Sequence, residues 1–340
     1  MNKTFSFAMI LMLAFLVGCG STTTKTTTQS PFVGGTNGLL FQWTSPTQDS
    51  NILFDKGQSS LPLILAIRND GEYTINTEYG NQPIKVTLDG VHFSDVDYEG
   101  YTYDLTKHVI DEELIGKKRN SDGTLREGFS TYVEFGDFSY MKSVSGDSIK
   151  TIRARICYPY KTFATANVCV TQSLVNPSKK DSLCSINGPI GIYSSSAPLQ
   201  VTNARQEVLR NNTILITFKI EHKSTGDFFA QDNCDPSFSN KDVVKVYVGD
   251  PDDLFWDVLS CKNFKNSPTG SYIAIVPTDP PTGLKRNNVR LINGEALVQC
   301  EIKLTRNDFG NYIKDLPITL EYSYQDDVSI PLLIRHMDEE

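Results

Sequence analysis

The side chains whose types and spacing best predict chemistry in this chain are its seven cysteines. Cys19 follows an apolar run, residues 5–17, that is too short to span a bilayer but has the length of a signal-peptide core. Leu16-Val17-Gly18 stands directly before it, and small residues there fit a signal peptidase, while the thiol accepts a diacylglyceryl group. The pattern predicts a lipoprotein signal peptide over residues 1–18 and lipidation of Cys19. An ordinary secretory signal with a chance cysteine is the alternative.

The other six cysteines are an even number, as a disulfide framework outside a reducing cytosol requires. If residues 156–170 form a hairpin that turns at Phe163, Cys157 lies directly opposite Cys169. Opposed residues of antiparallel strands bring their Cβ atoms close enough for a disulfide. The spacing therefore predicts a bond between Cys157 and Cys169.

The last four cysteines are expected to bond with one another. Cys261 and Cys300 each share a strand face with apolar neighbours, so both are expected to point into a core and to form one bond. Elimination then pairs Cys184 with Cys234. Four cysteines allow three connectivities, so two other sets remain open.

Metal ligands are few. The four histidines, His92, His108, His222 and His336, are far apart and no Cys-x-x-Cys pair occurs, so a zinc site is not predicted. Asp95, Asp97 and Glu99 alternate before a glycine, as in a calcium loop, but a threonine stands where the bidentate glutamate belongs. These three acids are a weak calcium candidate, and a solvated acidic loop is the alternative. His222 is expected to end a strand.

The chain carries no nucleophile elbow, phosphate loop, paired metalloprotease histidines or dinucleotide fingerprint. We therefore expect no enzymatic activity and no cofactor. A hydrolase that uses two carboxylates stays a remote alternative, because spacing in the sequence does not encode a gap of roughly 5–10 Å in space.

Aromatic residues offer a second alternative, a glycan- or small-ligand-binding surface. Tyr98, Tyr101 and Tyr103, with Trp43 and Trp256, could stack on sugars. Trp43 continues an alternation of apolar residues, which favours burial instead.

The elements that position these residues are predicted to be β-strands. Apolar residues alternate over residues 61–67, 214–220, 298–304 and 318–334, and turn residues separate the runs. The last run is expected to be a hairpin that turns at residues 325–327. Residues 104–115 are the best helix candidate.

Short strands with few helices predict an all-β protein of two tandem immunoglobulin-like antiparallel β-sandwiches. We expect module 1 over residues 36–174, a linker over 175–197 and module 2 over 198–340, with Cys184 tied back to module 2. Length and a hydrophobic content of 39% suit such globular modules.

Residues 19–35 are rich in serine and threonine and are expected to form a solvated tether between the lipid and the first module. Asn211 begins the one glycosylation sequon of the mature chain. A formal net charge of −8 argues against binding to nucleic acid.

The segment from Cys157 to Cys169 and the opening Pro31 to Leu39 resemble segments that recur in uncharacterised archaeal surface proteins, and similar matches touch most of the mature chain. The resemblance implies a membrane-tethered, disulfide-bonded β protein with immunoglobulin-like adhesion modules. It carries over no functional residues. Together with the anchor, it predicts a non-catalytic cell-surface protein, lipid-anchored at the extracytoplasmic face, whose partners are the membrane and other surface proteins.

Overall fold

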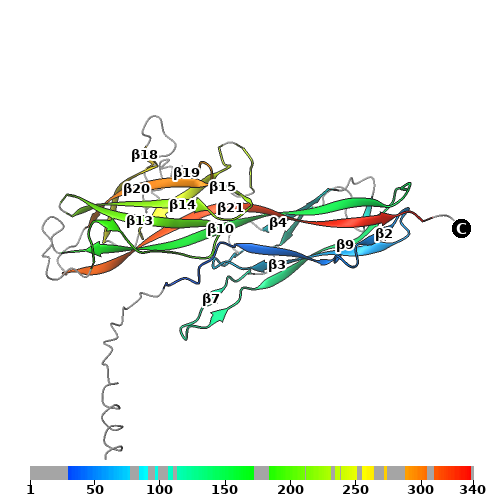
Figure 1. The fold of residues 1–340 in the computed structure, drawn as a ribbon, viewed down its shortest axis with the longest axis horizontal. Helices are drawn as coiled ribbons and strands as arrows, with labels where there is room; N and C mark the ends of the chain where they lie inside the picture. The colour runs from blue at the N-terminus through cyan, green and yellow to red at the C-terminus, as the bar shows by residue number, and fades with distance from the viewer. Residues whose placement is uncertain are drawn as a thin grey trace, which may run out of the picture. The chain divides into compact units, whose positions relative to one another are not determined.

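The structure is a computed structural model, and it describes residues 30–76, 84–90, 96–98, 106–109, 113–171, 184–210, 212–230, 234–237, 239–250, 255–263, 272–273, 288–304 and 310–337. The chain divides into two compact units, Met1–Pro31 and Phe32–Glu340. The second unit, called the body below, contains nearly all the described residues. Every regular element in the described part is a β-strand (Figure 1), so the all-β prediction is confirmed. The expected helix over residues 104–115 is wrong, because Thr106–Val109 is a strand.

Four sheets make up the described part of the body. The four-stranded sheet has the order β1 (Leu39–Ser45), β3 (Ser60–Asn69), β9 (Ser130–Tyr140), β5 (Val96–Tyr98). The six-stranded sheet has the order β11 (Gly188–Pro189), β13 (Leu199–Arg210), β14 (Thr213–His222), β20 (Glu295–Leu304), β17 (Trp256–Asn263), β18 (Tyr272–Ile273). A small hairpin pairs β7 (Lys118–Arg119) with β8 (Leu125–Arg126).

The largest sheet has nine strands. Its main path is β19 (Asn288–Arg290), β16 (Val243–Val248), β21 (Tyr312–Arg335), β10 (Ser148–Val170), β4 (Ile84–Asp89), β6 (Thr106–Val109). Off this path, β12 (Ile192–Ser194) pairs with β10, and β15 (Asp227–Phe229) and β2 (Ile52–Phe54) pair with β21. Only the β2–β21 pair is parallel among the strands described.

Two long strands, β10 with 23 residues and β21 with 24, form the centre of this sheet. They pair in one unbroken antiparallel register, from Ser148 opposite Ile334 to Val170 opposite Tyr312, and lie side by side in Figure 1. Neither strand contains a glycine, so neither offers the positive-φ residue that tight hairpin turns favour. The expected turns at Phe163 and at residues 325–327 are therefore wrong.

The nine-stranded sheet contains strands from both expected modules. β21 comes from the end of the chain, yet it pairs with β10 along its whole length and with β2 near the beginning of the body. The expected linker over residues 175–197 itself contributes β11 and β12. The two halves of the chain therefore share one sheet.

Most of the buried apolar residues that the structure describes form one large cluster, which draws on strands of all three large sheets. The alternation predicted from the sequence places the expected residues inside, including Leu61, Leu63, Leu65 and Ile67 on β3 and Ile214, Ile216, Phe218 and Ile220 on β14. Burying such rows on one face of each strand supplies most of the stabilisation of a sheet protein.

Candidate functional site

The six cysteines of the body are all disulfide-bonded, as expected. The bonds are Cys157–Cys234, Cys169–Cys184 and Cys261–Cys300. The expected Cys261–Cys300 bond is confirmed, and the expected pairs Cys157–Cys169 and Cys184–Cys234 are wrong.

The reason for the error is the continuity of β10. Cys157 and Cys169 lie twelve positions apart on this one strand. At about 3.3 Å per residue, their backbones are about 40 Å apart, far beyond the reach of a disulfide. Each cysteine therefore binds a partner from a different part of the chain.

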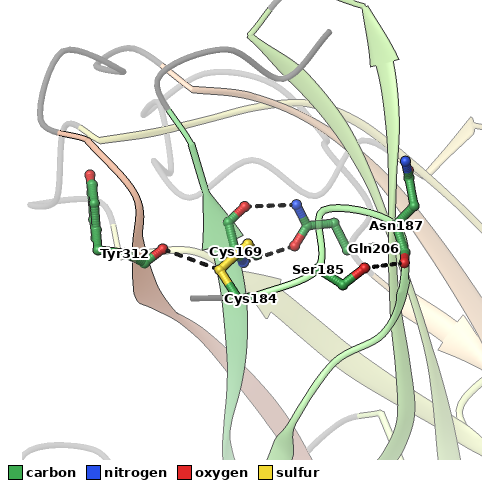
Figure 2. The surroundings of a disulfide bond; sticks show 6 residues. All are labelled: Cys169, Cys184, Ser185, Asn187, Gln206 and Tyr312. Carbon is green, nitrogen blue, oxygen red and sulfur yellow. Dashed lines mark hydrogen bonds between the residues drawn. A yellow bond between two sulfur atoms is a disulfide. The ribbon is translucent and has the colours of Figure 1, made fainter. Parts of the chain in front are cut away.

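The Cys169–Cys184 bond lies beside a buried glutamine (Figure 2). The Gln206 side chain of β13 accepts a hydrogen bond from the Cys169 N–H at 2.9 Å and donates one to the Cys169 carbonyl at 2.8 Å. The Gln206 amide thus satisfies the backbone N–H and carbonyl of Cys169, as a neighbouring strand would, and it joins the six-stranded sheet to β10. Removing it leaves two buried backbone groups without partners, which is costly.

The other two disulfides join different elements. Cys157–Cys234 connects β10 to the segment after β15, and the two cysteines pack with Phe229 in a small cluster of their own. Cys261–Cys300 links directly opposed residues of β17 and β20, and both are fully buried.

Four tyrosines occupy the middle of the β10–β21 pair. Tyr158 lies opposite Tyr324 and Tyr160 opposite Tyr322, so the four rings share one face. Their ring centroids are 5.7–6.4 Å apart around the square that they form. Tilted and edge-on contacts at such distances are favourable. These four residues are called the tyrosine cluster.

The hydroxyls of the tyrosine cluster bind neighbouring segments of the fold. Tyr158 accepts a hydrogen bond from the Leu39 N–H, and Tyr324 accepts one from the Gly226 N–H and bonds to His222 Nε2 at 3.0 Å. Burial raises the pKa of all four, for Tyr324 to about 12. The four hydroxyls therefore stay protonated at neutral pH, and the hydrogen bonds above join them to neighbouring segments.

Asn69, at the end of β3, links this cluster to a polar region beside it. Its buried amide donates to the carbonyls of Tyr73 and Leu114, at 2.7 and 2.9 Å. Its oxygen accepts from the Gly71 N–H and from the Tyr160 hydroxyl. All hydrogen-bonding positions of this side chain are thus in use within the fold.

The first residues of the body are held by one carboxylate. Glu72 accepts hydrogen bonds from the backbone N–H groups of Val33 at 2.9 Å, Gly34 at 3.0 Å and Ser196 at 2.7 Å. Beside it, Asp70 accepts from the Asn37 amide and lies 3.6 Å from the Lys117 ammonium. We call Val33, Gly34, Glu72 and Ser196 the tether seat, because the expected tether ends there.

Another carboxylate, which is buried, holds the end of β21. Asp55 is fully buried and accepts hydrogen bonds from His336 Nδ1, at 2.8 Å, and from the N–H groups of Val144 and Met337. The hydrogen bond from His336 contributes most to lowering the pKa of Asp55 below its usual range. The carboxylate therefore remains charged and fixes the end of the strand.

The candidate site residues named from the sequence are not brought together. Cys19, Asn211, Asp95 and Glu99 lie outside the described residues, and Asp97 is in β5, where it pairs with Ser139. In the part of the chain that is described, no three His, Cys, Asp or Glu side chains gather as metal ligands. In the same part, no helix is long and apolar enough to cross a membrane.

Two predictions about single residues are confirmed. Trp43 is buried, 7% exposed, and its Nε1–H lies 3.4 Å from the Val328 carbonyl, so its ring is not free to stack on a sugar. His222 ends β14. Tyr98 lies in β5 and Trp256 begins β17, while Tyr101 and Tyr103 are outside the described residues.

Sequence reasoning missed the tether seat and the tyrosine cluster. The repeated pattern Tyr-x-Tyr, at residues 158–160 and 322–324, was a signal for the cluster, because residues two apart share a strand face. Nothing in the sequence marked Glu72, since its three donors are backbone groups from distant segments.

Comparisons with known proteins identify no family. No family model and no curated protein matches the chain. One solved structure that matches is described as "Complete structure of manganese lipoxygenase of Gaeumannomyces graminis and partial structure of zonadhesin of Komagataella pastoris"; it is 9% identical, with a TM-score of 0.17 over 85% of this chain and 98% of that chain. Another, "The Triple Jelly Roll Fold and Turret Assembly in an Archaeal Virus", is 11% identical, with a TM-score of 0.14 over 89% and 92%. Likenesses this weak carry no argument about fold or function.

Proposed function

We propose that the chain is a non-catalytic, lipid-anchored protein of the extracytoplasmic membrane face, and that its body contacts other surface proteins. The observation that supports this most is the large core, which together with the Cys157–Cys234 disulfide ties both halves of the chain into one body, while two further disulfides brace it. A body closed in this way keeps its shape outside the cell, where disulfides persist. It suits a role in which a surface is presented rather than a substrate enclosed.

The proposal includes the finer architecture. We propose two immunoglobulin-like sandwiches that share the nine-stranded sheet, one formed with the four-stranded sheet and one with the six-stranded sheet. Apolar rows of β3 and of β14 both belong to the common core, which supports this arrangement. The two modules are then joined through β10 and β21 rather than by a flexible linker.

The roles of the buried polar groups support a structural rather than a catalytic function. Asp55, Asn69 and Gln206 direct their oxygen or nitrogen atoms at backbone groups of neighbouring segments. Such bonds hold loops and strand ends in place. A hydrolytic pair requires instead two carboxylates that face each other across an accessible space.

Cross-linking on intact cells tests this function. Cells that express the full chain are treated with a lysine-reactive cross-linker. Cells that express a Cys19→Ser chain are treated in the same way and give the background of an unanchored protein. We expect the full chain to capture a specific neighbouring surface protein, at a yield that Cys19→Ser does not reach. A full chain that is present on the cell surface and captures no neighbour above that background contradicts the interaction role.

A further inference from the structure

One exposed element of the body stands directly beside the tether seat. β7 and β8 belong to a longer hairpin, residues 115–129, whose base is closed by the hydrogen bond from the Phe129 N–H to the Ile115 carbonyl. The register continues through Lys118 opposite Arg126 to Asn120 opposite Thr124. Figure 1 shows this hairpin, labelled β7, projecting away from β3.

The hairpin is fixed at its base to the residues of the tether seat. The Lys117 N–H donates to the Gly71 carbonyl at 2.7 Å, and a Cβ atom on Gly116 would lie 2.7 Å from the Glu72 carbonyl carbon, so the two backbones are in close contact. Glu72 is the residue that also holds Val33 and Gly34. The chain therefore enters the body at the foot of this hairpin.

The hairpin carries charge of the opposite sign to the whole chain. Between residues 117 and 127 it has four cations, Lys117, Lys118, Arg119 and Arg126, and two acids, Asp122 and Glu127, a net +2 in a chain of −8. Lys117 is paired with Asp70, but among the described residues no carboxylate pairs with Lys118, Arg119 or Arg126. Lys118 and Arg126 lie directly opposite each other, and like charges in that position are unfavourable.

Apolar side chains are exposed on the same hairpin. Leu125 is 54% exposed next to the turn, and Phe129 is 51% exposed on the same face nearer the base. Their common face follows from the antiparallel register of the hairpin, in which Leu125 lies opposite Arg119 and Phe129 opposite Ile115. Three cations without a carboxylate partner among the described residues, next to an exposed apolar residue near the turn, match an anionic lipid surface, where cations bind headgroups and the apolar side chain enters the interface.

We propose that the 115–129 hairpin is a membrane-contact element that docks the body on anionic lipid headgroups. The inference rests on the proposed anchoring at Cys19, because residues 20–33 then connect the lipid to the foot of the hairpin. Even a fully extended stretch of that length spans only about 50 Å. The hairpin is thus the exposed basic element whose foot is adjacent to the point where the tether enters the body.

Tryptophan quenching by brominated lipid tests the docking. The lipidated full chain, carrying Leu125→Trp, is placed in vesicles of brominated phosphatidylcholine with or without phosphatidylglycerol. We expect stronger quenching in the phosphatidylglycerol vesicles, which salt reduces. Leu209→Trp, at an exposed position on β13, is the matched control and is expected to show no such difference.

Charge reversal identifies the groups responsible. Lys118→Glu with Arg126→Glu is expected to abolish the extra quenching, since losing two interfacial cations alone lowers partitioning about 30-fold. Lys303→Glu with Arg210→Glu changes the net charge equally on the six-stranded sheet and is expected to leave the quenching unchanged. Equal quenching of Leu125→Trp and Leu209→Trp overturns the inference, and so does an insensitivity to the first charge reversal.

The same vesicles separate this inference from the proposed function. A full chain that does not float with neutral vesicles contradicts the proposed lipid anchoring at Cys19. The hairpin is then tested alone, by flotation of the Cys19→Ser chain with phosphatidylglycerol vesicles. Binding there that requires Lys118 and Arg126 supports the hairpin, and no binding contradicts it. A photo-cross-linker at Leu125 that captures an acidic protein on intact cells instead of lipid also contradicts it.

Discussion

Single polar side chains that bind backbone groups hold the first residues of the body and the end of its last strand. Glu72 joins Val33, Gly34 and Ser196, and Asp55 joins the end of β21 to the segment after β9. Hydrogen bonds to a charged acceptor contribute more than neutral ones. These carboxylates are therefore expected to matter more for stability than the surface ion pairs.

Replacing Glu72 tests the tether seat. Glu72→Gln removes the charge and replaces one acceptor oxygen with an NH₂ group, which cannot accept a hydrogen bond from a backbone N–H. We therefore expect a loss of about 1–3 kcal/mol in the free energy of unfolding. The same variant should be cut more rapidly by protease near Gly35. Urea denaturation measures the first effect, and Glu207→Gln, an exposed residue paired with Arg205, should change stability by less than about 0.5 kcal/mol. Equal effects of the two substitutions contradict the assigned role.

Asp55 makes stability depend on pH in the acid range. Its pKa is lower in the folded chain than its unfolded value of about 3.9, so its contribution is complete above that value and is lost as pH falls through the folded pKa. We expect the Asp55→Asn variant to have a lower free energy of unfolding than the parent at neutral pH. We also expect this free energy to fall less on acidification than that of the parent. Lys219 and Lys223 lower the pKa of Glu221 to about 2, so Glu221 also makes stability depend on pH in the acid range. Because Glu221 is present in both the parent and the Asp55→Asn variant, the difference between their pH profiles isolates the contribution of Asp55. Parallel pH profiles of unfolding contradict this account.

Tyr324 provides the corresponding test in the alkaline range. Burial raises its pKa to about 12, so its contribution is complete below the unfolded pKa of about 10 and is lost as pH rises through the folded value. Tyr324→Phe leaves the Gly226 N–H without its partner, and we expect a loss of about 1–2 kcal/mol at neutral pH with a shallower alkaline decline. Chemical denaturation across pH measures both. A variant as stable as the parent shows that the hydroxyl does not hold the loop.

At the scale of elements, the β10–β21 pair decides both the topology and the disulfides. Alternation in the sequence identified the strands and their inward rows, because the period of two is a local property. It could not give strand length, since a strand ends where its partner ends, and the partner of β10 lies more than 140 residues away. The bond between Cys157 and Cys169 was predicted from a turn that those residues do not form.

Replacing cysteine pairs by serine tests the observed connectivity. The sequence separations are 77 for Cys157–Cys234, 39 for Cys261–Cys300 and 15 for Cys169–Cys184. The chain-entropy model then predicts losses of about 4.5, 4 and 3 kcal/mol in that order, measured by denaturation without reductant. Non-reducing peptide maps should join the peptides of Cys157 and Cys234. A map that joins Cys157 to Cys169 rules out a continuous β10.

For the whole molecule, we propose a tethered body that the chain enters at the tether seat. The sequence predicted the anchor, the tether and the all-β body from local patterns. It did not predict that the foot of the 115–129 hairpin meets the tether seat, because that contact joins residues about 40 and 80 positions apart. We therefore propose that the fold sets the orientation of the body toward a membrane, whereas lipidation of Cys19 would provide the attachment.

Mass spectrometry of the mature amino-terminal peptide from the membrane fraction tests the proposed lipid anchor. We expect a chain that begins at Cys19 and carries a diacylglyceryl group on its sulfur. A mature chain that begins elsewhere, or that retains an unmodified Cys19, contradicts it.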